Sequence, residues 1–245
     1  MIGRYCKFFG FLMGLWCIAL GSVVAASQPN GYAVSSAHAL ATEAGLSILE
    51  QGGNAYDAAV AVSAALAVVE PASSGIGGGG FWLLHSGDNK LSVMIDGREM
   101  APGGAHKNMY LDEQGNVVRD LAVNGGLAAG IPGAAAAWVH IANNYGSLPL
   151  DVLLEPAIVL AEQGYPADEK YITLLAMRES VMRRWPETAS IFMPSGEVPK
   201  LGEMIVQQDL ANTLRAIVRE GHDGFYAGEV AQKLVDGTRQ AGGIW

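Results

Sequence analysis

The sequence has few cysteines and little charge. Its 245 residues include 2 cysteines, and charged residues make up 16% of the chain, against about 25% in an average globular domain. Both cysteines, Cys6 and Cys17, lie within the first 26 residues. The rest of the chain therefore has no disulfide, no thiolate nucleophile and no cysteine-bound metal. The shortage of charge predicts that much of the surface is buried, either in a core or against a partner.

Basic residues are also few and scattered. The chain carries 15 lysines and arginines against 24 aspartates and glutamates, which gives a formal charge of -9. Proteins that bind nucleic acid show a basic stripe, so no nucleic-acid partner is expected. The 5 histidines form no H-x-x-x-H pair and no G-x-S-x-G elbow is present, which argues against a zinc site and a standard serine hydrolase. No metal and no cofactor are expected.

Residues 1–26 have the pattern of a secretory signal peptide. Arg4 and Lys7 form a positive start, an apolar run follows over residues 8–20, and the small residues Val-Ala-Ala complete the pattern. Cleavage there would leave residues 27–245 as an exported protein, periplasmic or secreted. A single membrane anchor is the alternative. The apolar run is short for a span and no stop-transfer segment follows, so no stable membrane span is expected.

Apolar spacing predicts a chain rich in helices with one hairpin. Helical periodicity marks residues 40–51, and Asn54 can cap a second helix to about Glu70 that is apolar nearly all round, as in the middle of a domain. Short apolar runs at residues 81–85 and 91–95 flank a turn and predict an antiparallel hairpin. Further helices are expected over residues 134–145, from Pro149 to near Gly164, and over residues 168–185, 207–220 and 229–240. The predicted class is α+β.

The predicted strands are too few to make a stable sheet. A two-stranded sheet is not independently stable in water, and the sequence stops at Trp245, shortly after a helix. We therefore expect the missing strands to come from another chain or from sequence that continues past Trp245. On this expectation residues 27–245 are a fragment.

A glycine-rich segment follows the apolar helix. Residues 75–80 match G-x-G-x-x-G, but a dinucleotide site needs a strand before the glycines and a helix after them. The predicted order here is helix, glycines, strand, which argues against a nucleotide-binding module. Two interpretations stay open for this segment: close packing of backbone against backbone, and the lining of a substrate pocket.

Arg98 and Glu99 follow the second predicted strand. Arginine suits bidentate binding of a carboxylate, because its planar fork of donors matches two oxygens. Most arginines are nevertheless ordinary surface residues, so residue type and position alone assign no function to this pair.

Several motifs in one order carry a family resemblance. They are Gly-Gly-Asn-Ala-Tyr-Asp-Ala-Ala-Val-Ala at 52–61, Gly-Gly-Gly-Gly-Phe at 77–81, Asp-Gly-Arg-Glu-Met-Ala-Pro at 96–102, Gly-Ile-Pro-Gly at 130–133, Tyr-Gly-Ser-Leu-Pro at 145–149, Gly-His-Asp-Gly-Phe-Tyr at 221–226 and a glycine pair at 242–243. Together they resemble the gamma-glutamyltranspeptidase family, and they span nearly all of residues 27–245.

The resemblance implies an N-terminal nucleophile hydrolase with an αββα sandwich, incomplete in this chain. Members of the family are made as a precursor that cuts itself, and the threonine that begins the second piece attacks the gamma-glutamyl amide of glutathione. Its own free amine can activate that hydroxyl. The acyl group then passes to water or to an amino-acid or peptide acceptor. The implied function is that of a gamma-glutamyltransferase or glutathione hydrolase, with the small subunit of the same precursor as partner.

The resemblance assigns Arg98 to the alpha-carboxylate of the glutamyl group, and Glu99 to holding that arginine or the substrate's amine. It places no catalytic residue in this chain, because the nucleophilic threonine belongs to the second subunit, so the chain alone is expected to be inactive. Within the family, an acylase of the cephalosporin type and a capsule-anchoring transpeptidase are alternatives. A noncatalytic scaffold protein of the same fold is the alternative outside enzymes.

Overall fold

The computed structural model of the chain describes residues 31–88 and 90–245. The chain divides into two units, Met1–Ala33 and Val34–Trp245, and all the helices and strands given below belong to the second. The predicted signal peptide, residues 1–26, lies outside the described residues. In the described part of the chain, no helix has the length and apolar character needed to cross a membrane.

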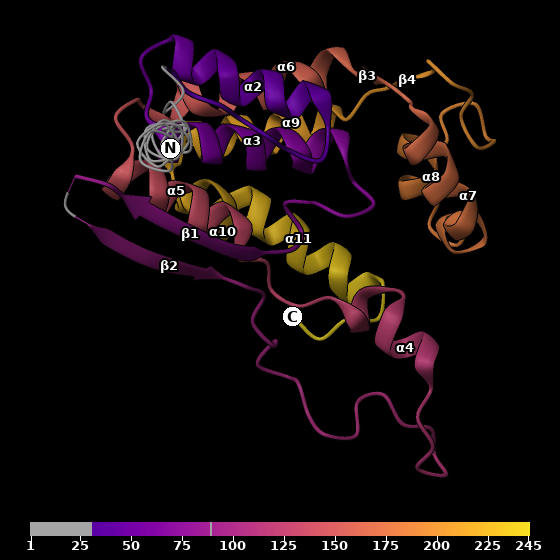
Figure 1. Cartoon of the computed structure of the whole chain (residues 1–245). Coiled ribbons are helices and arrows are strands. Elements are labelled where there is room, and N and C mark those ends of the chain that lie inside the picture. The colour runs from indigo at the N-terminus through magenta and orange to yellow at the C-terminus, as the bar shows by residue number, and fades with distance from the viewer. Residues whose placement is uncertain (1–30, 89) are drawn as a thin grey trace, which may run out of the picture. The chain divides into compact units, whose positions relative to one another are not determined.

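The first two helices follow the sequence prediction (Figure 1). Helix α2 spans Ala39–Glu50 and helix α3 spans Ala55–Val69. The side chain of Asn54 accepts hydrogen bonds from the N–H groups of Tyr56 and Asp57, while the Asp57 carboxylate accepts one from the Asn54 N–H. This reciprocal capping satisfies backbone donors that the start of a helix leaves free.

Helix α3 is the centre of the helical core. It packs against α2, α5 (Ala134–Tyr145) and α6 (Leu150–Gln163), and α9 (Gln208–Glu220) packs against α6. The side chains of Val60 and Ala64 on α3 are fully buried, as expected for a helix that is apolar nearly all round. The predicted bounds of these helices agree closely with the structure.

Asp57 joins two parts of this core. Its fully buried carboxylate accepts hydrogen bonds from the backbone N–H and the hydroxyl of Ser147, at 3.0 and 2.6 Å. Ser147 lies in the connection between α5 and α6. A buried carboxylate is costly unless its oxygens are hydrogen-bonded, so these donors hold the start of α3 against that connection.

The two predicted strands form the expected antiparallel hairpin. β1 spans Gly80–Ser86 and β2 spans Leu91–Gly97, and Gly80 pairs with Gly97. One face of the hairpin includes the buried Leu84, and β2 contacts α5 (Figure 1). The opposite face carries the exposed apolar side chains Phe81, Leu83 and Met94. The hairpin is therefore apolar on both faces but covered on one.

The region after α6 corrects the sequence prediction. The helix expected over residues 168–185 is α7 (Glu169–Met182), which ends three residues earlier than predicted, and a second helix that the sequence analysis did not predict, α8 (Pro186–Phe192), follows it. Proline disfavours helical geometry in the residue before it, and Trp185 is accordingly extended, with φ -123° and ψ 92°. Pro186 then begins α8, where its missing N–H leaves no hydrogen bond unmade.

Several short elements were not predicted. They are α4 (Arg119–Val123), the 3-10 helix η1 (Gly126–Ala128), β3 (Tyr165–Pro166), which pairs with β4 (Met204–Ile205), and α10 (Asp223–Tyr226). Elements of this length contain too few residues to show a periodicity. Helix α11 (Gly228–Gln240) follows as predicted. The described residues thus form an α+β arrangement.

Candidate functional site

Arg98 and Glu99 leave the hairpin together, directly after β2. The Nε of Arg98 donates a hydrogen bond to Glu99 Oε2 at 2.8 Å, and the Arg98 backbone N–H donates to Asp96 Oδ1 at 3.0 Å. The guanidinium carbon lies 5.8 Å from the centre of the Phe81 ring, within the range of a cation–π contact. These contacts hold the Arg98 side chain at the end of the hairpin.

The glycine-rich segment packs against the backbone just before Arg98. A Cβ atom added at Gly79 would lie 2.0 Å from the carbonyl oxygen of Gly97, and one added at Gly133 would lie 2.3 Å from the same oxygen. Only glycine allows backbones to approach this closely. Close backbone packing is therefore the structural role of the segment, and β1, not a helix, follows it as predicted.

The segment before α5 completes this packing. The carbonyl oxygen of Gly78 accepts hydrogen bonds from the N–H groups of Gly133 and Ala134, at 3.0 and 3.1 Å. Met100 and Ile131 form an antiparallel bridge through two backbone hydrogen bonds of 3.0 and 2.8 Å. Three motifs that are separate in the sequence therefore meet around Arg98.

The charges of Arg98 and Glu99 stabilise each other. The hydrogen bond to Glu99 and the negative charge of that group raise the pKa of Arg98. The hydrogen bond from Arg98, together with the positive charge of that group, holds the pKa of Glu99 below its ordinary range. Because the Arg98 side chain is 58% exposed, solvent screens this ion pair and it adds little to stability.

The outer edge of the Arg98 guanidinium is free. In the described part of the chain, no group accepts a hydrogen bond from either of its two terminal nitrogens. These nitrogens form a planar pair of donors whose spacing matches the two oxygens of a carboxylate. The arrangement can therefore hold a carboxylate in a fixed orientation.

Sequence reasoning predicted Arg98 and Glu99 as site residues but missed two residues that contact Arg98. These are Phe81 and Asp96, and the signal for them is the register of the hairpin, which pairs one with the other. The register places both at the end of the hairpin from which Arg98 leaves. A prediction of register, and not only of strands, was needed to find them.

The described residues contain no group of three or more histidine, cysteine, aspartate or glutamate side chains that could hold a metal ion. Two histidines lie beside single carboxylates: His38 is 3.7 Å from Asp168, and His222 is 3.1 Å from Asp223. His38 also accepts a hydrogen bond from the Leu40 N–H and so caps α2. The contacts of His38 are therefore those of a helix cap.

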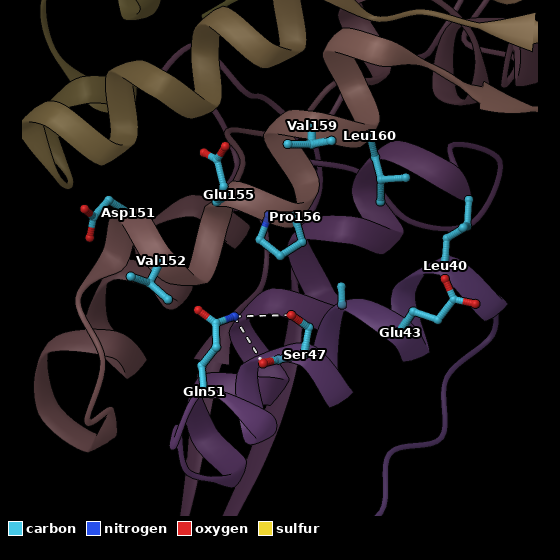
Figure 2. Close-up of a pocket in the computed structure, with 11 residues that line it drawn as sticks. Leu40, Glu43, Ser47, Gln51, Asp151, Val152, Glu155, Pro156, Val159 and Leu160 are labelled. Atoms are coloured by element: carbon cyan, nitrogen blue, oxygen red, sulfur yellow. Dashed lines mark hydrogen bonds between the residues drawn. The ribbon is translucent and has the colours of Figure 1, made fainter.

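A separate groove lies between α2 and α6 (Figure 2). It encloses about 600 Å³ and is lined mainly by apolar side chains, with Glu43, Asp151 and Glu155 among the lining residues. Gln51 hydrogen-bonds to the hydroxyl and the carbonyl oxygen of Ser47 on the α2 side. The groove shares no residue with the Arg98 site.

Comparison with known proteins identifies the family. The family model described as Gamma-glutamyltranspeptidase matches residues 41–245. The chain belongs to this family. One curated relative, the glutathione hydrolase proenzyme of Pseudomonas sp. (strain A14), is 42% identical over 232 residues, which are 92% of this chain and 40% of the relative. The chain therefore spans well under half the length of that relative.

The fold of the chain is similar to that of several solved structures. The crystal structure of Helicobacter pylori gamma-glutamyltranspeptidase matches with a TM-score of 0.85 at 42% identity, over 89% of this chain and 62% of that chain. The crystal structure of a cephalosporin acylase from Bacillus halodurans matches with a TM-score of 0.73 at 31% identity, over 89% of this chain and 44% of that chain. These matches confirm the predicted α+β fold of the N-terminal nucleophile hydrolase type, of which this gamma-glutamyltranspeptidase chain holds a part.

Proposed function

We propose that this gamma-glutamyltranspeptidase chain is part of an enzyme that cleaves the gamma-glutamyl amide of glutathione and related compounds. The observation that carries the proposal is the free outer edge of the Arg98 guanidinium, held in place by Glu99. The name glutathione hydrolase proenzyme, borne by a relative 42% identical to this chain, supports both the substrate class and a processed precursor.

Arg98 and Glu99 suit the two charged groups of a gamma-glutamyl substrate. The terminal nitrogens of Arg98 would bind the alpha-carboxylate through two charge-assisted hydrogen bonds. Glu99 would orient the guanidinium through its Nε, and its negative charge would attract the neighbouring alpha-ammonium group. Fixing both groups at the alpha carbon restrains where the gamma carbonyl can lie, which is the positioning that an acyl transfer needs.

The reaction centre itself would lie outside these 245 residues. We place the nucleophile on the threonine that begins a small subunit of the same precursor, with water, an amino acid or a peptide as acyl acceptor. A threonine hydroxyl is a weak nucleophile until a base such as its own free amine activates it. We also propose that the enzyme is exported, periplasmic or secreted, because residues 1–26 have the pattern of a signal peptide.

Replacing Arg98 tests the proposal. In the proenzyme that contains this chain, Arg98→Ala should weaken binding of a chromogenic gamma-glutamyl anilide by about 2–5 kcal/mol if the site is desolvated, so KM should rise by at least roughly 30-fold. The matched control is Arg184→Ala, because Arg184 is another half-exposed arginine with one carboxylate partner, Asp120. Its kinetics should not change. Equal kinetics for the two variants would remove Arg98 from the substrate site.

A related acylase is the second candidate, since a solved cephalosporin acylase shares this fold. A glutaryl anilide separates the two functions, because it keeps the carboxylate of a gamma-glutamyl anilide but lacks the ammonium group. A gamma-glutamyl enzyme should prefer the gamma-glutamyl compound, and Glu99→Gln should reduce that preference. Preference for the glutaryl compound would favour the acylase. Absence of turnover on either compound by the processed proenzyme would favour a noncatalytic scaffold.

A further inference from the structure

Glu70 is a buried carboxylate at the C-terminal end of α3. It is 8% exposed, and in the described part of the chain only Asp57 and Gln207 are also buried and polar. Asp57 caps the start of α3, and Gln207 donates a hydrogen bond to the Val68 carbonyl oxygen at 2.8 Å. Glu70, by contrast, faces the negative end of the α3 dipole, which disfavours its charge.

Lys170 balances this charge from another helix. Its Nζ forms an ion pair with Glu70 Oε1, although Lys170 lies in the first turn of α7, where a positive charge faces the positive end of the helix dipole. Each partner therefore sits at the helix end that disfavours its own charge. The attraction between Glu70 and Lys170 therefore holds the pair together, and the dipoles of the two helices do not favour it.

Glu70 also holds the turn that leads into the glycine-rich segment. Its backbone carbonyl oxygen accepts hydrogen bonds from the N–H groups of Ser73 and Ser74, at 3.1 and 2.9 Å. Its Oε2 accepts a hydrogen bond from the Ser74 hydroxyl at 3.3 Å. One carboxylate thus connects α7, through Lys170, to the residue immediately before the glycines.

The glycine-rich segment depends on anchors at its two ends. Residues 75–80 are glycine except for Ile76, and glycine restrains its own backbone least of all residues. At the far end, the Gly78 carbonyl oxygen accepts hydrogen bonds from the N–H groups of Gly133 and Ala134 at the start of α5, and Gly79 packs against the backbone of Gly97 and Arg98. At the near end, Glu70 is the anchor, through Ser74.

We propose that Glu70 is a positioning residue for Arg98, and that Lys170 keeps Glu70 in place. By fixing the start of the glycine-rich segment, Glu70 keeps Gly79 packed against the backbone of Gly97 and Arg98, and this packing positions the Arg98 guanidinium at the end of the hairpin. The inference rests on the proposed function of Arg98, but the order of the segment can be measured without any turnover.

Exchanging the two charges separates positioning from stability. In the double variant Glu70→Lys with Lys170→Glu the ion pair is restored, and each charge now sits at the helix end that favours it. A lysine cannot accept the Ser74 hydroxyl hydrogen bond, however. We therefore expect a Tm equal to or above that of the parent, yet faster hydrogen exchange at the amides of residues 75–80 and a KM raised roughly tenfold through misplacement of Arg98, with kcat within about twofold.

The same measurements apply to two further variants and a control. Glu70→Gln should show the same exchange and KM changes, and Ser74→Ala should show them more weakly while leaving the ion pair intact. Asp120→Asn breaks the surface ion pair with Arg184 and should change neither quantity. Unchanged exchange at residues 75–80 in the double variant would overturn the inference, as would a parental KM in that variant.

Failure of this inference can be told from failure of the proposed function. If Arg98→Ala leaves KM unchanged, the proposed substrate site is wrong. Amide hydrogen exchange at residues 75–80 in the double variant then decides by itself whether Glu70 anchors the segment. If Arg98→Ala raises KM while the double variant behaves as the parent, the substrate site holds and the role of Glu70 is refuted. If the double variant or Glu70→Gln does not fold, Ser74→Ala takes its place, because it removes one hydroxyl and leaves the ion pair intact.

Discussion

The helical core and the β1–β2 hairpin place their apolar residues differently. Most apolar side chains of α3 are buried against neighbouring helices, and Val60 is fully buried. On the hairpin, Leu84 is 5% exposed, whereas its neighbour Leu83, on the opposite face, is 70% exposed. The core is complete within the described residues, while the outer face of the hairpin has no cover there.

This difference shows that the exposed face of the β1–β2 hairpin is the part of the chain that lacks a covering layer among the described residues. A strand that is apolar on both faces is typical of a sheet packed between two layers, and an exposed apolar patch commonly marks an interaction surface. The uncovered face is therefore where a further sheet of the N-terminal nucleophile hydrolase fold would pack. Arg98 lies at the edge of that face, over the exposed Phe81, so the proposed substrate site and the uncovered face adjoin.

The largest expected difference between the two regions is in stability. Trp138 on α5 is 1% exposed and its indole N–H donates a hydrogen bond to Ser63 Oγ. Trp138→Ala should lower the free energy of unfolding by about 3–5 kcal/mol, because it leaves a cavity in the core. Leu83→Ala on the uncovered face should change it by no more than about 0.5 kcal/mol. Urea unfolding of both variants measures the difference, and similar losses would contradict the comparison.

A smaller effect is expected from making the uncovered face polar. The double variant Leu83→Lys with Met94→Lys should leave the free energy of unfolding within about 0.5 kcal/mol of the parent. It should reduce self-association and the binding of an apolar dye, because the exposed patch is interrupted. Val117→Lys changes a single exposed apolar residue outside the hairpin and serves as control. Equal dye binding by the two variants would show that the exposed face of the hairpin is not the surface that binds the dye.

The smallest effect concerns the charge pair at the edge of the hairpin. Folding lowers the pKa of Glu99, mainly through its hydrogen bond with Arg98, so the pair stabilises the folded chain above the ordinary pKa of a glutamate, about 4.3. That stabilisation is lost as pH falls through the lower folded-state value. Because solvent screens the pair, this stabilisation should be small.

Unfolding of the parent and of Glu99→Gln between about pH 3 and pH 7 tests this sign. The parent should be the more stable at pH 7, and the two should converge in acid. A gap that widens towards low pH would mean that Glu99 is not held ionised by Arg98.

The longer helices were predictable because each shows its own local signals. Asn54 caps α3 as expected, and the closing glycines mark the ends of the helices around it. The helix expected over residues 168–185 is present as α7 but ends at Met182, before the extended Trp185 that precedes Pro186. The pairing of β3 with β4 joins segments far apart in sequence, and no local pattern reports such a contact.

The candidate site was predictable only in part. The resemblance predicts Arg98 and Glu99 as site residues, while the free outer edge of the guanidinium depends on its three-dimensional surroundings. The anchor at Glu70 was also hidden, because its partner Lys170 lies 100 positions away in the sequence. Contacts of this kind follow from how α3 and α7 pack, which single-sequence patterns do not specify.

The close approach at Gly79 restricts how this protein can evolve. Any change of one codon base that alters the amino acid there adds at least a Cβ atom, and that atom would meet the Gly97 carbonyl oxygen at 2.0 Å. No missense mutation is then conservative at this position, whatever the new side chain. At Gly75, where the nearest atom to an added Cβ is 3.9 Å away, alanine fits. Within the glycine-rich segment, Gly79 therefore tolerates no substitution, whereas Gly75 tolerates alanine.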